Sequence, residues 1–209
     1  MFTAGALTFQ EFAMRVPLPL ATIHDAVLEF LCDRDDAVVF GAQAVNAYVS
    51  EPRMTQDVDL LSPRAKEPAE ELRNYLSKKF HANIATRQIN IGQNEYRLFQ
   101  IRKSGNRHLV DVRPVEKMPS ARRIAQVLVV EPVELIANKV IAYHQRRDQP
   151  KSGTDWRDLA MLLLTFPELK RETGPVVDRL NAAGADETVL SVWRKLVAQE
   201  IRPADDDDI

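Results

Sequence analysis

Two aspartates separated by one residue, Asp57 and Asp59, are the side chains of this sequence best suited to chemistry. They lie on an apolar segment, and side chains two apart on a strand point to the same face. We therefore expect both carboxylates on one face, with Val58 and Leu60 on the other. Two parallel carboxylates repel each other, and a bound Mg²⁺ or Mn²⁺ would relieve that repulsion because these ions prefer oxygen ligands. The alternative is a strand end at which both carboxylates are solvated.

The segment before the aspartates adds groups that suit phosphate. Gly41 follows a predicted strand over 37–40 and opens a short helix, whose free backbone N–H groups could bind phosphate oxygens. Arg53 and Thr55 add a cation and a hydroxyl group just before the carboxylates. The pattern predicts a phosphate-binding site beside a metal site.

A third carboxylate, Asp111, lies in the middle of an apolar strand predicted over 108–112. A charge in that position is costly unless it is paired or bound to a metal ion. The alternative to a metal site is a salt bridge to Arg97, Arg102 or Arg113. The histidines, by contrast, show no spacing typical of a metal cluster.

The composition predicts an ordinary soluble protein of one domain or two closely packed lobes. The chain has 209 residues, of which 45% are apolar and 28% charged, and its net charge is −2. Any binding to nucleic acid or membrane must therefore be local. The single cysteine, Cys32, excludes an internal disulfide and a cysteine zinc site. We predict neither a signal peptide nor a membrane span, and expect a cytoplasmic protein.

Hydrophobic periodicity predicts an α/β (α+β) fold in which a mixed β-sheet flanked by helices is followed by a C-terminal helical lobe. The sheet lobe is expected over 1–120 and the helical lobe over 121–209. Helices are predicted from Thr8 and over 20–34, 67–80, 174–180 and 185–201, with two more beginning at Glu131 and at Thr154, the expected cap of the second. Strands are predicted over 37–40, 57–61, 84–87, 96–101 and 108–112. After Pro119 the only strand expected is 127–130.

Two helices of the predicted C-terminal lobe carry further charged candidates. Lys139 lies on a stripe beside the apolar face of the first, and Asp155 and Asp158 begin the second. The simpler interpretation leaves Lys139 in solvent and places Asp155 favourably at a helix N-terminus, which contributes only about 0.3–1 kcal/mol.

These motifs together resemble a known family. The run Gly41-Ala42-Gln43-Ala44, followed by Arg53, Thr55, Asp57 and Asp59 in order, is similar to the first motif of the polymerase-β-like nucleotidyltransferase superfamily. The nearest resemblance is to its AbiEii-like branch, which includes toxins of toxin–antitoxin systems. Ala42 departs from the usual glycine or serine at that position, so a side-chain hydroxyl contact to phosphate would be missing.

The resemblance implies transfer of a nucleotide from a nucleoside triphosphate (NTP) to an acceptor hydroxyl with Mg²⁺ or Mn²⁺. The acceptor would be a tRNA, a protein or a small molecule, with the first two favoured, and a cognate antitoxin would be a further partner. The alternatives are a catalytically weak nucleotide-binding or partner-binding module, which Ala42 keeps open, and an antitoxin-like or structural protein. Asp111 would lie nearest the acceptor and help take its proton, and the helical lobe would close over the nucleotide. The implied metal ligands are Asp57, Asp59 and Asp111, and the implied nucleotide-binding residues are Gly41, Ala42, Arg53, Thr55, Lys139, Asp155 and Asp158.

Overall fold

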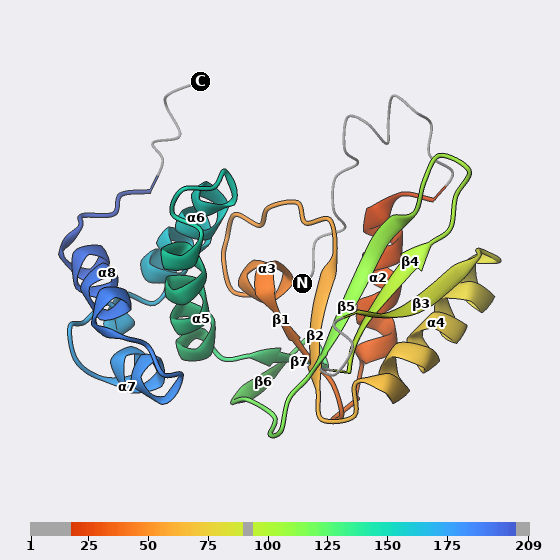
Figure 1. Ribbon diagram of the computed structural model, residues 1–209, viewed down its shortest axis with the longest axis horizontal. Coiled ribbons are helices and arrows are strands. Elements are labelled where there is room, and N and C mark those ends of the chain that lie inside the picture. Colours follow the sequence, from red (N-terminus) through yellow and green to blue (C-terminus); the bar gives the residue numbers. More distant parts are fainter. Residues whose placement is uncertain (1–17, 90–93, 204–209) are drawn as a thin grey trace. The chain divides into compact units, whose positions relative to one another are not determined.

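The chain divides into two compact units in the computed structural model, which describes residues 18–89 and 94–203 (Figure 1). Among the described residues, the first unit comprises 18–47, 52–89 and 94–130, and the second comprises 48–51 and 131–203. The sequence prediction placed the boundary between the two lobes after residue 120. The helix predicted from Thr8 lies outside the described residues.

A mixed sheet forms the first unit, and within the described residues it has seven strands in the order β3-β4-β5-β2-β1-β7-β6. Strands β2 and β5 are parallel, as are β1 and β7, and the remaining neighbours are antiparallel. The predicted mixed α/β fold is confirmed. The strands are β1 (Val38–Phe40), β2 (Val58–Ser62), β3 (Ile84–Ile89), β4 (Glu95–Gln100), β5 (Arg107–Pro114), β6 (Ala121–Ile124) and β7 (Val127–Val130).

Helices α2 (Leu20–Leu31) and α4 (Lys66–Phe80) pack against the sheet, and the short helix α3 (Gly41–Asn46) connects β1 to the loop before β2 (Figure 1). Ile23 and Val27 of α2 and Leu72 and Leu76 of α4 are fully buried, as expected for helices with one apolar stripe. Helix α2 ends earlier than the predicted residue 34, because Cys32 has a ψ of 131° and Asp33 a φ of 60°, neither of which continues an α-helix.

The strand β6 was not expected from the sequence. It forms a hairpin with β7, in which Ile124 pairs with Val127 across a two-residue turn. The turn residues Ala125 and Gln126 have φ values of 47° and 70°, a conformation that glycine and asparagine usually supply. The hairpin joins the sheet because β7 pairs with β1, so the sheet extends beyond Pro119, where the sequence signal weakens.

The second unit is helical. Its first helix, α5, packs against α6, α7 and α8, and Trp193 of α8 is buried with its indole N–H donating to the Arg171 carbonyl at 2.9 Å. The prediction that Thr154 caps a helix is wrong, because α6 begins at Lys151 and includes Thr154 in its interior. No helix in the described ranges is both long and apolar enough to cross a membrane. The helices are α5 (Pro132–Gln145), α6 (Lys151–Thr165), the 3₁₀ turn Pro167–Leu169, α7 (Pro175–Ala182) and α8 (Glu187–Ala198).

Candidate active site

Parallel pairing of β2 with β5 places two of the candidate carboxylates opposite each other. Asp59 of β2 is in register with Asp111 of β5, and Asp111 is in turn in register with Arg97 of β4. Residues in register on neighbouring strands project from the same face of a sheet. Val58 and Leu60, which alternate with Asp57 and Asp59, are fully buried on the opposite face, as expected.

Asp111 is almost fully buried, with only 2% of its side chain exposed, and it is held by two neighbours. Arg97 donates from Nε to Oδ1 at 2.7 Å and from Nη2 to Oδ2 at 2.8 Å, which is a bidentate pair. Nε2 of His108 lies 2.9 Å from Oδ1, while Nη2 of Arg113 is 3.9 Å from Oδ2. The salt bridge considered as an alternative role for Asp111 is therefore present, with Arg97 as its main partner.

These contacts determine the charge of Asp111. Burial alone raises the pKa of a carboxyl group, but the hydrogen bonds from Arg97 and His108 outweigh that effect. They hold the pKa of Asp111 well below its usual range. The carboxylate is consequently ionised at neutral pH, as ligation of a cation requires, and it is a weaker proton acceptor than an ordinary aspartate.

His108 belongs to the site although its sequence pattern gave no indication of this. Its Nδ1 lies 3.2 Å from Oδ2 of Asp57, so the ring bridges Asp57 and Asp111. One ligand atom from each of these three residues lies within 4.8 Å of the others, close enough for them to share a metal ion. In a regular strand, His108 and Asp111 would point to opposite faces. The β4–β5 ladder shifts register between Leu98 and Phe99, near His108, and such irregularities re-aim side chains.

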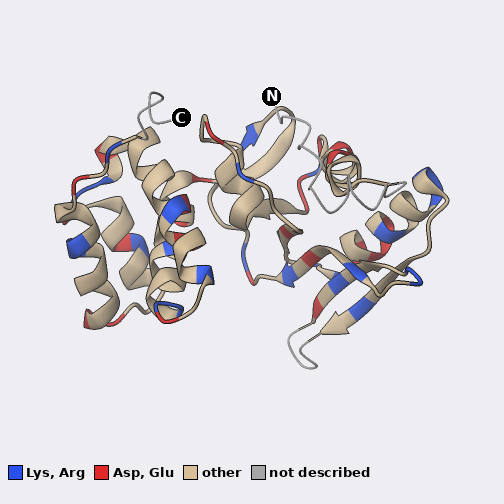
Figure 2. Ribbon diagram, turned by 90° about the horizontal axis from the view of Figure 1, so that it is seen from above, with Lys and Arg blue, Asp and Glu red and all other residues tan. Residues whose placement is uncertain are grey.

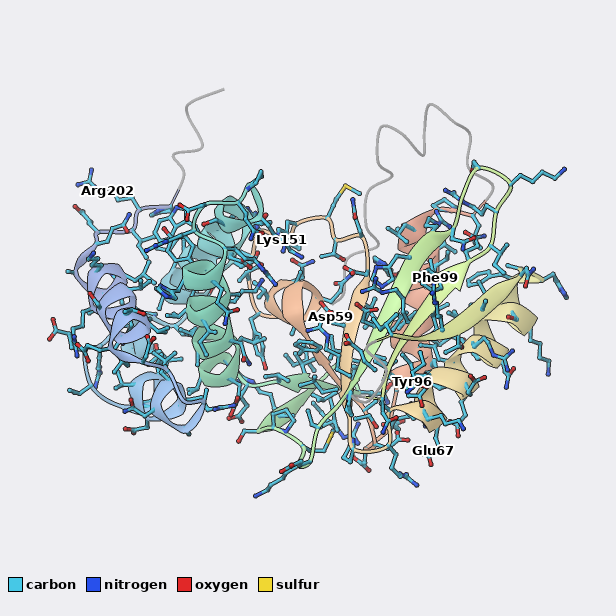
Figure 3. All side chains as sticks on the ribbon, in the orientation of Figure 1. Asp59, Glu67, Tyr96, Phe99, Lys151 and Arg202 are labelled. Atoms are coloured by element: carbon cyan, nitrogen blue, oxygen red, sulfur yellow. The ribbon has the colours of Figure 1, made fainter. Side chains whose placement is uncertain are left out.

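Asp59 is not part of that trio, and its contacts include Arg113 and Gly41. Nη2 of Arg113 donates to its Oδ1 at 3.3 Å, and Nε of Arg113 donates to Glu95 at 2.9 Å. Asp59, which Figure 3 shows beside α3, also lies against Gly41, where a Cβ atom would come within 2.4 Å of Oδ2. Gly41 has a φ of 68°, and the α3 helix that it begins has only six residues. The glycine is thus required both by the backbone conformation and by the space that Asp59 occupies.

Helix α3 also holds the segment that leads to the carboxylates. The amide side chain of Asn46 pairs with the backbone of Arg53, donating to its carbonyl at 2.7 Å and accepting from its N–H at 3.0 Å. Gln43 donates to the hydroxyl of Thr55 at 3.1 Å, and Thr55 is buried. Ala42, between Gly41 and Gln43, is half-buried. The structure therefore brings Thr55 and the backbone of Arg53 against α3, the helix that Gly41 begins.

The remaining candidates meet in the second unit. Nζ of Lys139 donates to Asp158 at 2.6 Å and to Asp155 at 3.2 Å, and Arg146 donates to Asp155 at 3.0 Å. Both aspartates are at least 98% buried, and the Lys139 side chain is 13% exposed. The interpretations that leave Lys139 in solvent and Asp155 as a helix-terminus charge are both wrong. Asp155 lies more than one turn inside α6, where Lys139 and Arg146 compensate its burial.

Acidic and basic residues occur together throughout the described chain, with no extended region of one sign (Figure 2). On the sheet they lie on neighbouring strands, which agrees with the cross-strand pairing of Arg97 with Asp111. The specific ion pairs at the candidate site include those of Asp111 with Arg97 and His108.

Solved structures of other proteins share this fold. The structure is similar to that of the Megavirus polyadenylate synthase, with a TM-score of 0.56 and 13% identity over 71% of this chain and 32% of that chain. It is also similar to JHP933 from Helicobacter pylori, with a TM-score of 0.53 and 12% identity over 92% of this chain and 93% of that chain. At sequence identities this low, the structural similarity establishes a shared fold and nothing more. The present chain spans 32% of the length of the viral synthase.

A sequence model of the family described as nucleotidyl transferase AbiEii toxin, of type IV toxin–antitoxin systems, matches residues 29–189. The chain belongs to this AbiEii family, which confirms the resemblance drawn from the motif around Gly41 and Asp57. No curated protein matches the chain in sequence.

Proposed function

We propose that this protein transfers a nucleoside monophosphate from an NTP to an acceptor hydroxyl in a reaction that depends on Mg²⁺ or Mn²⁺. The observation that carries the proposal is the parallel pairing of β2 with β5, which sets Asp59 opposite Asp111. Membership of the AbiEii nucleotidyl transferase family supports the same reaction.

The donor atoms at the site fit divalent cations. Asp57, Asp59 and Asp111 would contribute carboxylate oxygens, with Asp59 in register with Asp111, and His108 bridges Asp57 and Asp111. Oxygen-rich sites suit Mg²⁺ and Mn²⁺. When bound, two such ions would stabilise the entering and leaving oxygens of an in-line displacement at phosphorus.

The protein's own residues would orient the reactants. Asp111 is ionised and fixed by Arg97 and His108, so its charge needs no reorganisation when the nucleotide arrives. Arg53 and Thr55 would supply a cation and a hydroxyl group for phosphate oxygens, and the backbone of Gly41 lies directly beside Asp59. The role of Ala42 would be confined to its backbone N–H.

Lys139, Asp155 and Asp158 remain proposed nucleotide-binding residues. Two carboxylates fix the ammonium group of Lys139, which limits the side-chain entropy that a long lysine would otherwise lose on contacting a phosphate. Asp155 and Asp158 would act through Lys139 in this scheme.

The family description supports a role as the toxin of a toxin–antitoxin pair, with a cognate antitoxin as partner. In that role the acceptor hydroxyl would belong to an RNA, such as the 3′ end of a tRNA, or to a protein. A toxin of this kind would act by blocking the acceptor group that it modifies.

A transfer assay tests the proposal. Purified protein would be incubated with Mg²⁺, each NTP labelled in its α-phosphate in turn, and either total tRNA or cell lysate. We expect label on RNA or on a protein with the wild type and no label with the Asp57→Ala/Asp59→Ala variant. Asp35→Ala is the matched control, since Asp35 is an exposed aspartate of the same unit that pairs with Arg123. Binding of NTP without any transfer would overturn the proposal in favour of the binding module.

A further inference from the structure

Three of the hydrogen-bonding directions of the Asp111 carboxylate are already in use. A carboxylate offers about four acceptor directions, two on each oxygen. Arg97 uses one on each oxygen, and Nε2 of His108 lies at hydrogen-bonding distance from Oδ1. The Nη2 of Arg113, at 3.9 Å, is too distant to hydrogen-bond to Oδ2. Within residues 18–89 and 94–203, Oδ2 therefore keeps one direction open.

Arg113 links Oδ2 of Asp111 to a neighbouring carboxylate. Its Nη2 lies 3.9 Å from Oδ2 of Asp111 and donates to Oδ1 of Asp59 at 3.3 Å. Oδ1 of Asp111, by contrast, faces His108, whose other nitrogen contacts Asp57. The two oxygens of one carboxylate therefore face different neighbours.

We propose that Arg97 and His108 are positioning residues that fix the Asp111 carboxylate so that Oδ2 is the oxygen presented to a divalent cation. The salt bridge to Arg97 then supports metal binding instead of replacing it. A bidentate guanidinium pair sets the plane of a carboxylate as well as its position, which a single contact would not do. This inference rests on the proposed function in one respect, that Asp111 is a metal ligand.

Conservative variants separate geometry from charge. Arg97→Lys keeps the positive charge but loses the planar fork that holds both oxygens. At His108 the two ring nitrogens are separable, because a glutamine amide reaches approximately the place of Nε2 and an asparagine amide that of Nδ1. His108→Gln should therefore keep the contact to Asp111, and His108→Asn only that to Asp57.

The experiment measures binding of Mn²⁺ to the full chain without nucleotide, from the electron paramagnetic resonance signal of the free ion. Groups that orient metal ligands typically contribute about 10–100-fold in metal affinity. We expect Arg97→Lys and His108→Asn to weaken Mn²⁺ binding within that range, and His108→Gln to restore most of the affinity. In the transfer assay the same two variants should lower kcat with little change in KM for the NTP. Arg87→Gln is the matched control, because Arg87 is an exposed arginine of the same sheet, in register with Arg97 on the neighbouring strand.

An Mn²⁺ affinity of Arg97→Lys equal to that of the wild type would overturn the inference, even if the variant unfolds at a lower urea concentration. Tighter binding by Arg97→Gln would also overturn it, because the guanidinium would then be a competitor of the ion for Asp111. If Arg97→Lys fails to fold, equal Mn²⁺ affinities of His108→Asn and His108→Gln would overturn the inference in its place. A different result, equal Mn²⁺ binding by the wild type and by the Asp57→Ala/Asp59→Ala variant, would contradict the proposed metal site itself.

Discussion

Replacing Gly41 by alanine tests how closely the backbone of α3 and the Asp59 carboxylate depend on each other. Two penalties are expected. An alanine at a φ of 68° is in the left-handed region, which costs about 1–2 kcal/mol for a residue with a Cβ atom. The new Cβ would also lie 2.4 Å from Oδ2 of Asp59. Cβ contacts shorter than 3.0 Å are essentially never seen, so the carboxylate must move.

The second penalty is the one that bears on function. Asp59 would have to swing away from its place opposite Asp111, and a misplacement of about 1 Å at a reacting centre can lower a rate by about 100-fold. We therefore expect backbone strain to lower the unfolding free energy of Gly41→Ala by about 1–2 kcal/mol in urea. We expect its transfer activity to fall by about 100-fold.

Gly184→Ala is the matched control for this prediction. Gly184 has a φ of 75° and no atom within 4 Å of the position of an added Cβ, so it carries the strain without the collision. Its loss of stability should be similar, and its activity should remain that of the wild type. Full transfer activity in Gly41→Ala would show that Asp59 does not need the position that the glycine allows, contrary to this prediction.

Two further changes have clear expected outcomes. The pKa of Asp111 is lower in the folded state, so its stabilising effect is present above the unfolded pKa of about 3.9 and is lost as the pH falls below that value. The difference in unfolding free energy between the wild type and Asp111→Asn should therefore be largest at neutral pH and shrink towards pH 3. A difference that stays constant with pH would contradict the lowered pKa. Lys139→Met leaves Asp158 and one side of Asp155 without their ammonium partner and should cost about 3–5 kcal/mol in urea unfolding. An unchanged midpoint would mean that these pairs contribute no net stability, and a Lys139→Met/Asp158→Leu double variant should recover part of the loss.

The sequence predicted the parts of this fold that depend on local patterns. Alternation around Asp57 to Leu60 gave the orientation of the β2 side chains, and the apolar periodicity over 67–80 gave α4 to within one residue. The glycine after a buried strand marked the start of α3. Each of these features is determined by neighbours within a few residues along the chain.

The features that the sequence did not reveal depend on distant residues or on unusual local geometry. The strand β6 escaped notice because its turn uses Ala125 and Gln126 at positive φ, without the glycine or asparagine that usually marks such a hairpin. The role of Asp155 was misjudged because its burial depends on packing of α6 against α5, which brings Arg146 and Lys139 to it.

His108 illustrates the same limit at the candidate site. In a regular strand a residue three positions before Asp111 points away from it. Only the paired strand reveals that the ladder shifts register near His108, and only the parallel pairing of β2 with β5 brings Asp57 within reach of the ring. Non-local strand pairing therefore assembled a group of residues that spacing along the chain could not predict.

The most direct measurement of the central claim asks which phosphorus atom of the NTP is transferred. The wild type and the Asp111→Asn variant would each be given Mg²⁺, an RNA and protein extract, and an NTP labelled either in the α-phosphate or in the γ-phosphate. We expect the wild type to attach the α-label to an acceptor and to release the γ-label as pyrophosphate, and Asp111→Asn to do neither. Attachment of the γ-label, or equal transfer by the Asp111→Asn variant, would contradict a nucleotidyl transfer centred on these carboxylates.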